Sequence, residues 1–452
     1  MRKLSMLALA AAMTSAALTG CGSDDTPDKP AASSSAAAGQ SEGATPSAES
    51  GKPVTLTFMT YTYADRTKST DAWIKDMKDK YNITIELQNV PTDQYETAVK
   101  TKLAAGDIPD LLMTHTISKD LTLYGTQMDP DLFLDISDVP SVSQYIPSVV
   151  ADAKDNKAGK LYFVPVSTNA LGVLYNKKTF SDNDIAVPTD RQAFEAASDK
   201  LKSAGLIPIA GGFKDSWTTQ IIPFIAYGQY INAKDMTTRI KIADGTMKAA
   251  DIADDFKKVL AVQQNWRDRG YFPKDFLGTD ANVASTMVGT GKAAMLVSGT
   301  WQYKAIQDAD PEAQIGFFAL PLNEPGEKTV VPTSASGGLV ISAKTANPEA
   351  AKLAMDVYLS AENQTRIMAD LNGIPTNTQV KVDNAFVADI NAAMAAGDVQ
   401  PDWWGVNYYH PASLSGFAPD KEFQSLLADG TTPDRFIEGY DKGIAKALEA
   451  AK

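Results

Sequence analysis

Four of the six tryptophans lie in stretches that are too polar to belong to a core. Trp217, Trp301 and the adjacent Trp403 and Trp404 are surrounded by Gly, Ser, Thr, Asp and Pro in apparent loops. A wide ring offers a large apolar face at a small entropy cost, so an indole in a polar loop often marks a binding surface. One side of a pyranose is mostly C–H, and its hydroxyl rim suits carboxylates, amides and backbone groups. These tryptophans predict a sugar-binding surface, although one or two of them could instead close the body of a domain.

Metal-dependent and nucleophilic chemistry have few candidate residues in this chain. The only histidines are His115 and His410, and the only cysteine is Cys21, so neither a multi-histidine site nor a thiolate cluster can form. The sequence has no His-Glu-x-x-His or Gly-x-Ser-x-Gly pattern, and "GTGKAA" at residues 289–294 lacks the leading glycine and the Ser/Thr of a phosphate loop. We expect no catalytic residue, no metal and no cofactor.

The start of the chain has the layout of a secretory signal. Arg2 and Lys3 precede an apolar run over residues 4–17, which is too short for a stable membrane-spanning helix. Cys21 ends this segment. Residues 22–52 contain no aromatic, Leu, Ile or Val residue, so we expect a flexible linker there and a folded body from Pro53 onward.

The folded body is expected to hold at least two domains, because about 400 residues exceed the size at which one core keeps growing. Acidic residues outnumber basic ones, 55 to 42, for a net charge of −13. This charge argues against nucleic acid as a partner and gives no attraction to anionic lipid headgroups.

The first half of the body alternates strands with helices. Strands are expected at residues 54–59, 83–87 and 110–114, with a helix carrying Trp73 and a second helix between them. This order predicts a parallel, doubly wound α/β sheet, whose ligands bind beyond the carboxyl ends of the strands. The residues that follow the first and third strands, and are therefore expected at this edge, include Tyr61, Tyr63, Thr114 and His115.

The second half repeats this alternation. Strands are expected at residues 170–176, 206–210 and 292–299, and Trp301 follows the last of them. Trp73 and Trp266 lie in amphipathic helical patterns and are expected in the core. Helix boundaries follow from capping patterns: boxes at Asp93 with Glu96 and at Thr189 with Gln192, stops at Gly106 and Gly205, and starts at Pro348 and Pro433.

Five stretches in order along the chain together carry a family resemblance. They are "KLAAGDIPDLLMT", "GKLYFVPVSTNALGVLYNKKTF", "GKAAMLVSGTWQ", "IGFFALP" and "TANPEAAKLAMDVYLSAENQ", and they follow Leu18-Thr19-Gly20-Cys21, which resembles a bacterial lipobox. Together they resemble the extracellular solute-binding proteins of carbohydrate ABC importers. The lipobox resemblance implies cleavage before Cys21 and lipid attachment to its sulfur, at the extracellular face of the cell membrane.

The family resemblance also implies a fold and a division of the chain. The fold is α/β and two-lobed, of the type II periplasmic-binding-protein kind, with a mostly parallel doubly wound sheet in each lobe and a hinge between the lobes. The implied segments are a signal peptide at 1–20, a lipidated cysteine with linker at 21–52, an N-terminal lobe at 53–165 and 331–375, and a C-terminal lobe at 166–330 and 376–452. The ligand would lie between the lobes, which close around it.

The resemblance extends to individual residues. It makes Trp301 of "SGTWQ" the first candidate for stacking on a sugar, followed by Trp217, Trp403 and Trp404. Thr114, His115, Asn169 and Gly338, the last with Gly337, fall where the family contacts its ligand. The chain departs from the maltose-binding members at Thr114, where they carry an aromatic residue, so maltodextrin as the ligand is not implied.

Two classes of function remain open from the sequence. The first is a lipid-anchored, monomeric receptor that captures a sugar, such as an oligosaccharide, and presents it to ABC permease subunits in the membrane. The second is a secreted glycan hydrolase or glycan-adhesion module on the same tether. A glycosidase needs only two suitably spaced carboxylates, and Asp65, Asp215 and Asp402 lie near the loop aromatics.

Overall fold

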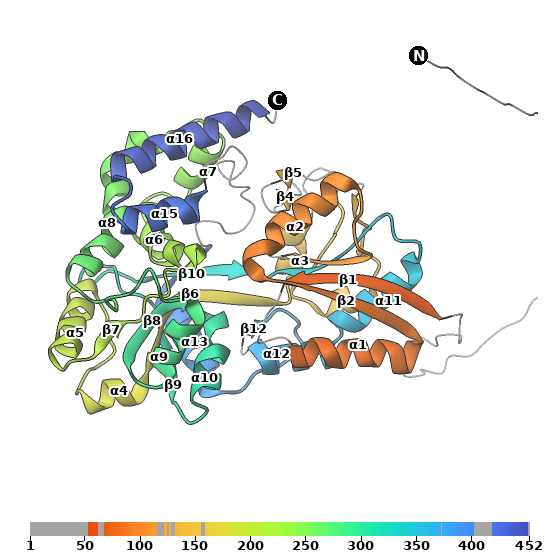
Figure 1. Ribbon diagram of the computed structural model, residues 1–452, viewed down its shortest axis with the longest axis horizontal. Helices are drawn as coiled ribbons and strands as arrows, with labels where there is room; N and C mark the ends of the chain where they lie inside the picture. Colours follow the sequence, from red (N-terminus) through yellow and green to blue (C-terminus); the bar gives the residue numbers. More distant parts are fainter. Residues whose placement is uncertain are drawn as a thin grey trace, which may run out of the picture. The chain divides into compact units, whose positions relative to one another are not determined.

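Strand β1 (Val54–Tyr61) begins where the sequence first alternates β-branched and apolar residues, as predicted. The computed structural model in Figure 1 describes residues 53–61, 67–114, 122–123, 126–127, 132–154, 159–371, 373–401 and 418–450. These residues lie within one compact unit. They build two large sheets and the helices that pack on them.

The first sheet has the predicted β-α-β-α-β order. Its strands are arranged β11-β3-β1-β2, with β2 at Ile83–Val90, β3 at Leu111–Thr114 and β11 at Gly338–Ile341. Helices α1 (Thr67–Tyr81) and α2 (Thr92–Ala105) make the crossovers, so β1 pairs in parallel with both β2 and β3. Strand β11 returns from the distant part of the chain and pairs antiparallel with β3.

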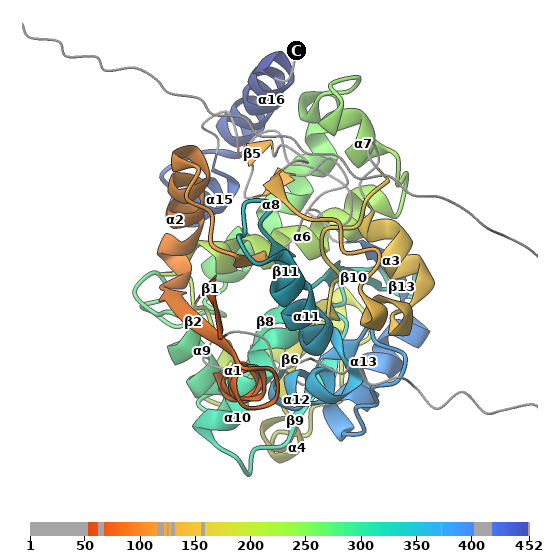
Figure 2. The same ribbon diagram turned by 90° about the vertical axis from the view of Figure 1, so that its right-hand side faces the viewer.

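Trp73 is the centre of the core beneath this sheet, as its helical pattern predicted. Its side chain is fully buried and meets Phe58 edge-on at 5.5 Å and Tyr358 at 5.3 Å between ring centroids. The indole N–H donates to the carbonyl oxygen of Ala354 at 3.2 Å, which satisfies its one polar group. Figure 2 shows α1 beside α11 (Pro348–Leu359) and α12 (Ala361–Leu371), which complete this core.

The second sheet is mixed, so the prediction of a mostly parallel sheet is wrong for this part of the chain. Its strands run β13-β10-β6-β8-β7, and β9 and β12 also pair with β6. Strand β6 is antiparallel to β8, β9, β10 and β12, while β7 with β8 and β10 with β13 are parallel. The bounds are β6 Ser167–Asn176, β7 Ile207–Ile209, β8 Ala293–Gly299, β9 Ile315–Phe318, β10 Val330–Ala335, β12 Ile374–Pro375 and β13 Asp398–Pro401.

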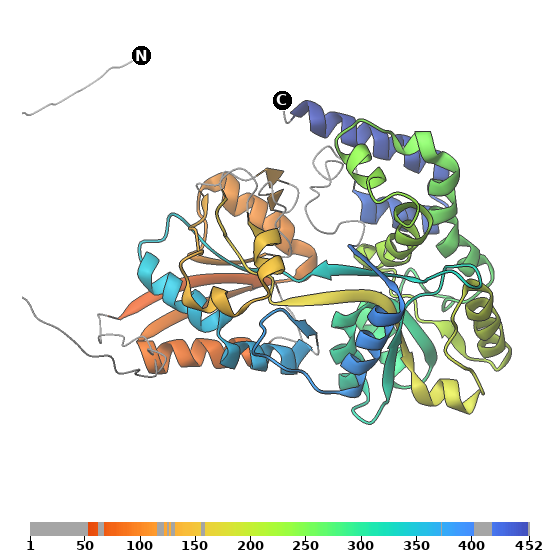
Figure 3. The same ribbon diagram turned by 180° about the vertical axis from the view of Figure 1, so that it is seen from behind.

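The connection from the first sheet determines the direction in which β6 runs. This strand carries the chain from the first sheet into the second, so its amino end lies where the two sheets meet. Strands β7 and β8 run the opposite way and bring their carboxyl ends to that same edge. Figures 1 and 3 show β6 beside β10, its antiparallel partner.

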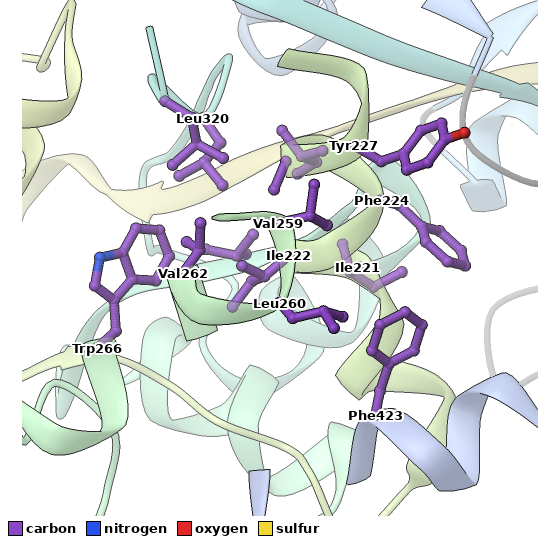
Figure 4. Close-up of a cluster of buried hydrophobic side chains, with 14 of the residues drawn as sticks. Ile221, Ile222, Phe224, Tyr227, Val259, Leu260, Val262, Trp266, Leu320 and Phe423 are labelled. Carbon is purple, nitrogen blue, oxygen red and sulfur yellow. The ribbon is translucent and has the colours of Figure 1, made fainter. Parts of the chain in front are cut away.

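The second core is larger and mainly helical. Helices α6 (Ile221–Tyr227) and α8 (Ala253–Asp268) contribute most of the side chains in Figure 4, and Trp266 of α8 is 2% exposed. Its predicted place in the core is confirmed. Phe423 of α15 (Pro419–Leu427) and Phe436 of α16 (Pro433–Ala450) add to this cluster, with ring centroids 4.7 Å apart.

The remaining elements are short. The helices are α3 Pro147–Ala153, α4 Lys177–Asp182, α5 Arg191–Ser203, α7 Thr238–Ala243, α9 Ala281–Gly289, α10 Tyr303–Ala309 and α13 Ala385–Ala396. Single turns are η2 Pro140–Gln144, η3 Ser216–Gln220, η4 Gly228–Asn232, η5 Ala249–Ile252 and η6 Thr300–Gln302, and β4 (Thr122–Leu123) pairs with β5 (Thr126–Gln127). Among the described residues, no helix combines the length and the apolar character needed to cross a bilayer.

Helix ends agree with the predictions only in part. Gly106 and Gly205 take the left-handed conformation that stops a helix, with φ of 69° and 82°, and Pro348 and Pro433 open α11 and α16. Both capping boxes are wrong by a residue or more. Helix α2 begins at Thr92 after Pro91, and α5 is capped by Asp190, which accepts the N–H of Ala193 at 2.8 Å.

The passages of the chain between the two sheets lie close together. One precedes β6, one lies between β10 and β11, and one is at β12, which pairs with Ser167 and Thr168. The backbone N–H of Ser336 donates to the Ser167 carbonyl oxygen at 2.8 Å, and the Ser167 N–H donates to Ser336 Oγ at 2.9 Å. Thr376 Oγ1 donates to the carbonyl oxygen of Pro165. These bonds hold the passages side by side.

Candidate functional site

Two predicted aromatic residues come from the carboxyl ends of neighbouring parallel strands. Ile207 and Ile209 of β7 pair in register with Ala293 and Met295 of β8. Parallel neighbours end at the same edge of a sheet, so the segments that follow them lie close together. The segment after β7 leads to Trp217 in η3, and the segment after β8 leads to Trp301 in η6.

The Trp301 ring packs against Gly299. A Cβ placed on Gly299 would lie 2.0, 2.2 and 2.3 Å from the Cζ3, Cη2 and Cε3 atoms of the Trp301 ring. The indole therefore lies directly over the Cα of the last residue of β8, in space that any side chain would fill. Gly299 pairs with Leu171 of β6, so the Trp301 ring packs directly on a strand of the sheet.

Trp217 is fixed by hydrogen bonds made by its neighbours in η3. Thr218 Oγ1 donates to the Gly212 carbonyl oxygen at 2.9 Å, and Thr219 Oγ1 contacts the Asp420 carbonyl oxygen at 3.1 Å. Ser216 Oγ also donates to the carboxylate of Asp420, at the first turn of α15. The turn that carries the indole is thereby fastened both to the loop before it and to a helix near the end of the chain.

The two indoles meet at the margin of the second core. Their ring centroids are 6.3 Å apart and their planes are inclined by 54°. Both residues are half-buried and pack against the core cluster, so each presents only part of its surface. The structure thus brings together the two described loop tryptophans, which the sequence separates widely.

Asn169 lies on β6, the strand that contacts the turn carrying Trp301. Leu171 of β6 pairs with Gly299, the last residue of β8, and β6 also contacts η6. Asn169 is half-buried and pairs on its other side with Ser334 of β10.

Thr114 and Gly338 pair with each other at the end of the first sheet. Gly338 is four positions after Ser334, the partner of Asn169, and four steps span at most roughly 13 Å at the extended rise of about 3.3 Å per residue. Thr114 is fully buried, and its Oγ1 has no hydrogen-bond partner among the described residues. A Cβ on Gly338 would lie 2.7 Å from both Phe163 Cδ2 and the Val164 carbonyl oxygen, so this glycine permits close packing there.

Tyr61 has a different environment from the one predicted. The ring is 1% exposed in the first core and contacts Tyr95, with centroids 5.1 Å apart. Tyr95 in turn donates through its hydroxyl to the Met113 carbonyl oxygen at 2.6 Å. The aromatic at the end of β1 is therefore a packing residue in this structure.

Several predicted positions lie outside the described residues. These are Tyr63, His115, Trp403, Trp404 and the lipid-attachment candidate Cys21, together with Asp65 and Asp402. Their roles stay predictions from the sequence.

Asp215, two residues before Trp217, and Asp280 both bond to the start of α9. Asp215 Oδ2 accepts the backbone N–H of Ala281 at 2.9 Å, and Asp280 Oδ1 accepts that of Val283 at 2.8 Å, so both carboxylates cap α9. Negative charge is favourable at a helix N-terminus. No group of three or more His, Cys, Asp or Glu side chains in the described part of the chain is arranged to hold a metal ion.

The residues that sequence reasoning missed are those that position the rings. Gly299 was part of the quoted "SGTWQ" motif, and a glycine two residues before a loop aromatic is a usable signal of close ring packing. Asp420 and its bonds to η3 gave no such signal, because their partners are about 200 residues apart in the chain.

The fold joins two sheets through closely spaced passages, and a pair of half-buried indoles lies at the carboxyl edge of β7 and β8. The chain belongs to the family of bacterial extracellular solute-binding proteins, whose sequence pattern matches residues 72–396. The family prediction is confirmed.

Two curated relatives are similar over most of the chain. The multiple sugar-binding protein of Streptococcus mutans serotype c is 25% identical over 330 residues, 70% of this chain and 74% of that protein. The melibiose/raffinose/stachyose-binding protein MelE of Bacillus subtilis is 22% identical over 306 residues, 66% of this chain and 68% of that protein. Both are binding proteins by name.

Solved structures share the fold. A sugar transporter from Bacillus licheniformis in complex with stachyose has a TM-score of 0.72 at 19% identity, covering 86% of this chain and 98% of that chain. A chitin oligosaccharide binding protein has a TM-score of 0.73 at 22% identity, covering 88% and 100%. The two-lobed, type II periplasmic-binding-protein fold is thereby confirmed.

Proposed function

We propose that this chain is the substrate-binding component of an ABC importer and that it captures an oligosaccharide between its two lobes. Its family is extracellular and binds solutes. The curated relatives are named for binding multiple sugars and for melibiose, raffinose and stachyose. The captured sugar would be delivered to permease subunits, which are separate chains in the membrane.

The single observation that carries the proposal is the meeting of Trp217 and Trp301 at the carboxyl edge of β7 and β8. Half-buried indoles at such an edge offer apolar faces to the C–H side of a sugar ring. Asn169 lies on β6, which contacts the turn that carries Trp301, and it offers an amide that can both donate to and accept from hydroxyl groups. Thr114 pairs in the first sheet with Gly338, which is four positions after Ser334, the partner of Asn169 in the second.

The proposed lobes are residues 53–165 with 331–375 and residues 166–330 with 376–452. The closely spaced passages at Ser167, Ser336 and Thr376 support a hinge between them, because few backbone torsions there need to change for the lobes to close. Closure requires that the sugar bind the closed form better than the open form.

The proposal includes a tether and a monomeric state. Cys21 would be lipidated after cleavage of residues 1–20, so that the folded body is held outside the cell membrane by the linker 22–52. A lipoprotein among the relatives supports this part: a maltooligosaccharide ABC transporter solute-binding lipoprotein of Streptococcus pneumoniae matches 49% of this chain at 24% identity.

Binding without hydrolysis is part of the proposal. The relatives are named as binding proteins. A glycosidase works through a pair of carboxylates whose environments give them different protonation states. Asp215, the described acidic candidate near the indoles, is instead engaged in capping α9.

Thermal unfolding with a panel of mono- and oligosaccharides tests the proposal. A ligand at 100 times its Kd adds about 2.7 kcal/mol of stability, which raises the midpoint by several degrees. We expect one group of sugars to raise the midpoint and to be recovered intact afterwards. A panel without any shift would contradict the sugar assignment, and recovery of cleaved sugar would establish a hydrolase.

A further inference from the structure

We propose that Asp420 and Gln424 of α15 are positioning residues for sugar binding, and that they act by holding the turn that carries Trp217. This inference rests on the proposed function and adds to it two residues from a helix near the end of the chain. Its basis is a set of hydrogen bonds that crosses from α15 to the segment between β7 and α6.

Asp420 holds the turn itself. Its carboxylate accepts from Ser216 Oγ, and its backbone carbonyl oxygen contacts Thr219 Oγ1 at 3.1 Å. Ser216 and Thr219 lie on either side of Trp217 in η3, and both are buried. The position of the turn relative to α15 is therefore fixed before and after the indole.

Gln424 holds the approach to the turn. Its Nε2 donates to the carbonyl oxygen of Phe213 at 2.7 Å and to that of Lys214 at 3.2 Å. An amide nitrogen carries two N–H groups, so both bonds can form at once. Asp420 and Gln424 are four positions apart, which places them on the same face of a helix. One face of α15 thus makes both sets of bonds.

Another face of α15 packs on the second core. Phe423 is 1% exposed, and its ring centroid lies 6.3 Å from that of Phe224 in α6 and 4.7 Å from that of Phe436 in α16. Figure 4 shows Phe423 and Phe224 in this core. Near the other end of α15, Gln264 Nε2 of α8 donates to the Leu426 carbonyl oxygen at 3.3 Å. The face that holds the turn therefore belongs to a helix that is itself fixed in the lobe.

A positioning role differs from a purely structural role in what it does to affinity. Trp217 lies in a single 3₁₀ turn, and a turn of this kind has few internal bonds to keep it in place. Ordering the turn at the moment of binding would lower the affinity, whereas bonds formed during folding remove that cost. Loss of these bonds should therefore weaken binding only while the indole is present. A residue that merely stabilised the lobe would show no such dependence on Trp217.

A double-mutant cycle measured by isothermal titration tests the inference on the purified chain. The probes are raffinose, stachyose and maltotetraose, together with the sugar that raises the thermal midpoint most, and the one that binds tightest is used throughout the cycle. We expect Asp420→Ala and Gln424→Ala each to weaken binding about five- to tenfold, the scale of a lost hydrogen bond. In the Trp217→Ala background each should weaken it by less than about twofold.

The cycle separates failure of the inference from failure of the proposed function. Equal losses in both backgrounds, or no loss in either, overturn the inference and leave the proposed function standing. If no probe binds and no sugar of the thermal panel shifts the midpoint, both are overturned.

Conservative and control variants isolate the bond to the turn. Asp420→Asn keeps an oxygen that can accept from Ser216, so its affinity should stay within about twofold of wild type, and Ser216→Ala should match Asp420→Ala. Gln264→Ala is the matched control, because it removes a bond to the far end of α15, and it should leave the affinity unchanged. A loss in Gln264→Ala as large as that in Asp420→Ala would overturn the inference. Equal losses in Asp420→Asn and Asp420→Ala would also overturn it, since the charge would then carry the effect.

Tryptophan fluorescence gives a readout that needs no sugar. Displacing the Trp217 ring changes its contact with solvent and therefore its emission. We expect Asp420→Ala to shift the emission spectrum of the folded chain, and we expect this shift to be absent when Trp217 is replaced in the Trp217→Phe background. A shift of the same size in both backgrounds would arise from another tryptophan and would overturn the inference.

Discussion

The two sheets end in aromatic residues at the edge where they meet, but they use these residues differently. At the first sheet, Tyr61 is buried and packs on Tyr95, which is itself bonded to the backbone of β3. At the second, Trp217 and Trp301 keep part of their surface exposed at the margin of the core. The same strand-end position therefore contributes packing in one sheet and a candidate binding surface in the other.

The cause of the difference lies in what surrounds each ring. Tyr61 belongs to β1, which lies between β2 and β3, so its ring is enclosed by the crossover helix that carries Tyr95. Trp301 follows β8 and folds back over a glycine, and Trp217 is carried by a single turn. Exposure here follows from the local chain, and residue type alone does not determine it.

The largest expected difference is in the free energy of unfolding, between alanine variants of a tryptophan in the core and of a tryptophan at its margin. Trp73→Ala removes a fully buried indole that contacts Phe58 and Tyr358, and we expect it to lower the free energy of unfolding by about 3–5 kcal/mol. Trp301→Ala should lower it by about 1 kcal/mol or less, because the ring is half-exposed. Urea denaturation measures both.

The matched control for core burial is Trp266→Ala, whose indole is 2% exposed in the second core and should behave like that of Trp73. If Trp301→Ala proved as destabilising as Trp73→Ala, Trp301 would be a residue that closes its domain. That was the second interpretation of the loop tryptophans.

Sugar affinity should depend on the half-buried tryptophan and not on the aromatic residue buried at the first sheet. We expect Trp301→Ala to weaken sugar binding by about 1–3 kcal/mol, the scale of burying one aromatic side chain, which is roughly 5- to 150-fold in Kd. Tyr61→Phe should leave Kd unchanged, since its ring is packed inside the first core. Calorimetric titration with the sugar identified by thermal unfolding measures both. A tenfold loss in Tyr61→Phe would contradict the comparison of the two edges.

Much of the fold follows from local patterns in the sequence. The first sheet could be predicted because its strands and crossover helices are consecutive, and glycines at Gly106 and Gly205 mark helix ends through their backbone conformation. The direction of the second sheet could not, because β6 pairs with β10 and β12, which lie far along the chain. Pairing between distant segments leaves no periodic signal in either of them.

The site divides in the same way. That Trp217 and Trp301 meet follows from two parallel strands with loops at one edge, which the sequence order indicates. The burial of Tyr61 was not predictable, because the local sequence around a tyrosine at the end of a strand does not show whether a helix covers its ring. The angle between the indoles depends on Gly299 and on bonds to Asp420, and neither effect is local to a ring.

The Asp110 carboxylate links Thr57 and Thr345 to the first sheet, so the stability of the fold should depend on pH. Asp110 Oδ2 accepts from the Thr57 N–H and hydroxyl, each at 2.8 Å, and Oδ1 accepts from Thr345 Oγ1 at 2.6 Å. Burial alone would raise the pKa of Asp110, but the bonds from Thr345 and Thr57 outweigh it and hold the pKa below its ordinary value of 3.8. Asp110→Asn should therefore lower stability at neutral pH by about 1–2 kcal/mol, allowing for partial exposure.

The sign of the pH effect follows from the lowered pKa. A carboxyl group with a lower pKa in the folded state stabilises the fold above its ordinary pKa and loses that contribution as the pH falls through the folded value. The gap between wild type and Asp110→Asn should thus be full at neutral pH and shrink below about pH 4. Asp107→Asn, which removes an exposed partner of Lys102, is the control and should change little. A gap that stays constant with pH would show that Asp110 is not the linked group.

The smallest expected effect concerns the cap of α5, which the sequence pattern placed one residue too early. Asp190 Oδ1 accepts the N–H of Ala193 at the start of α5, whereas Thr189, the predicted cap, is exposed. We expect Asp190→Ala to lower the free energy of unfolding by about 1 kcal/mol and Thr189→Ala by clearly less, both measured by urea denaturation. Equal losses would mean that the two residues share the cap. Asp190 bonds to the backbone at the start of its own helix, so we expect neither substitution to alter sugar affinity.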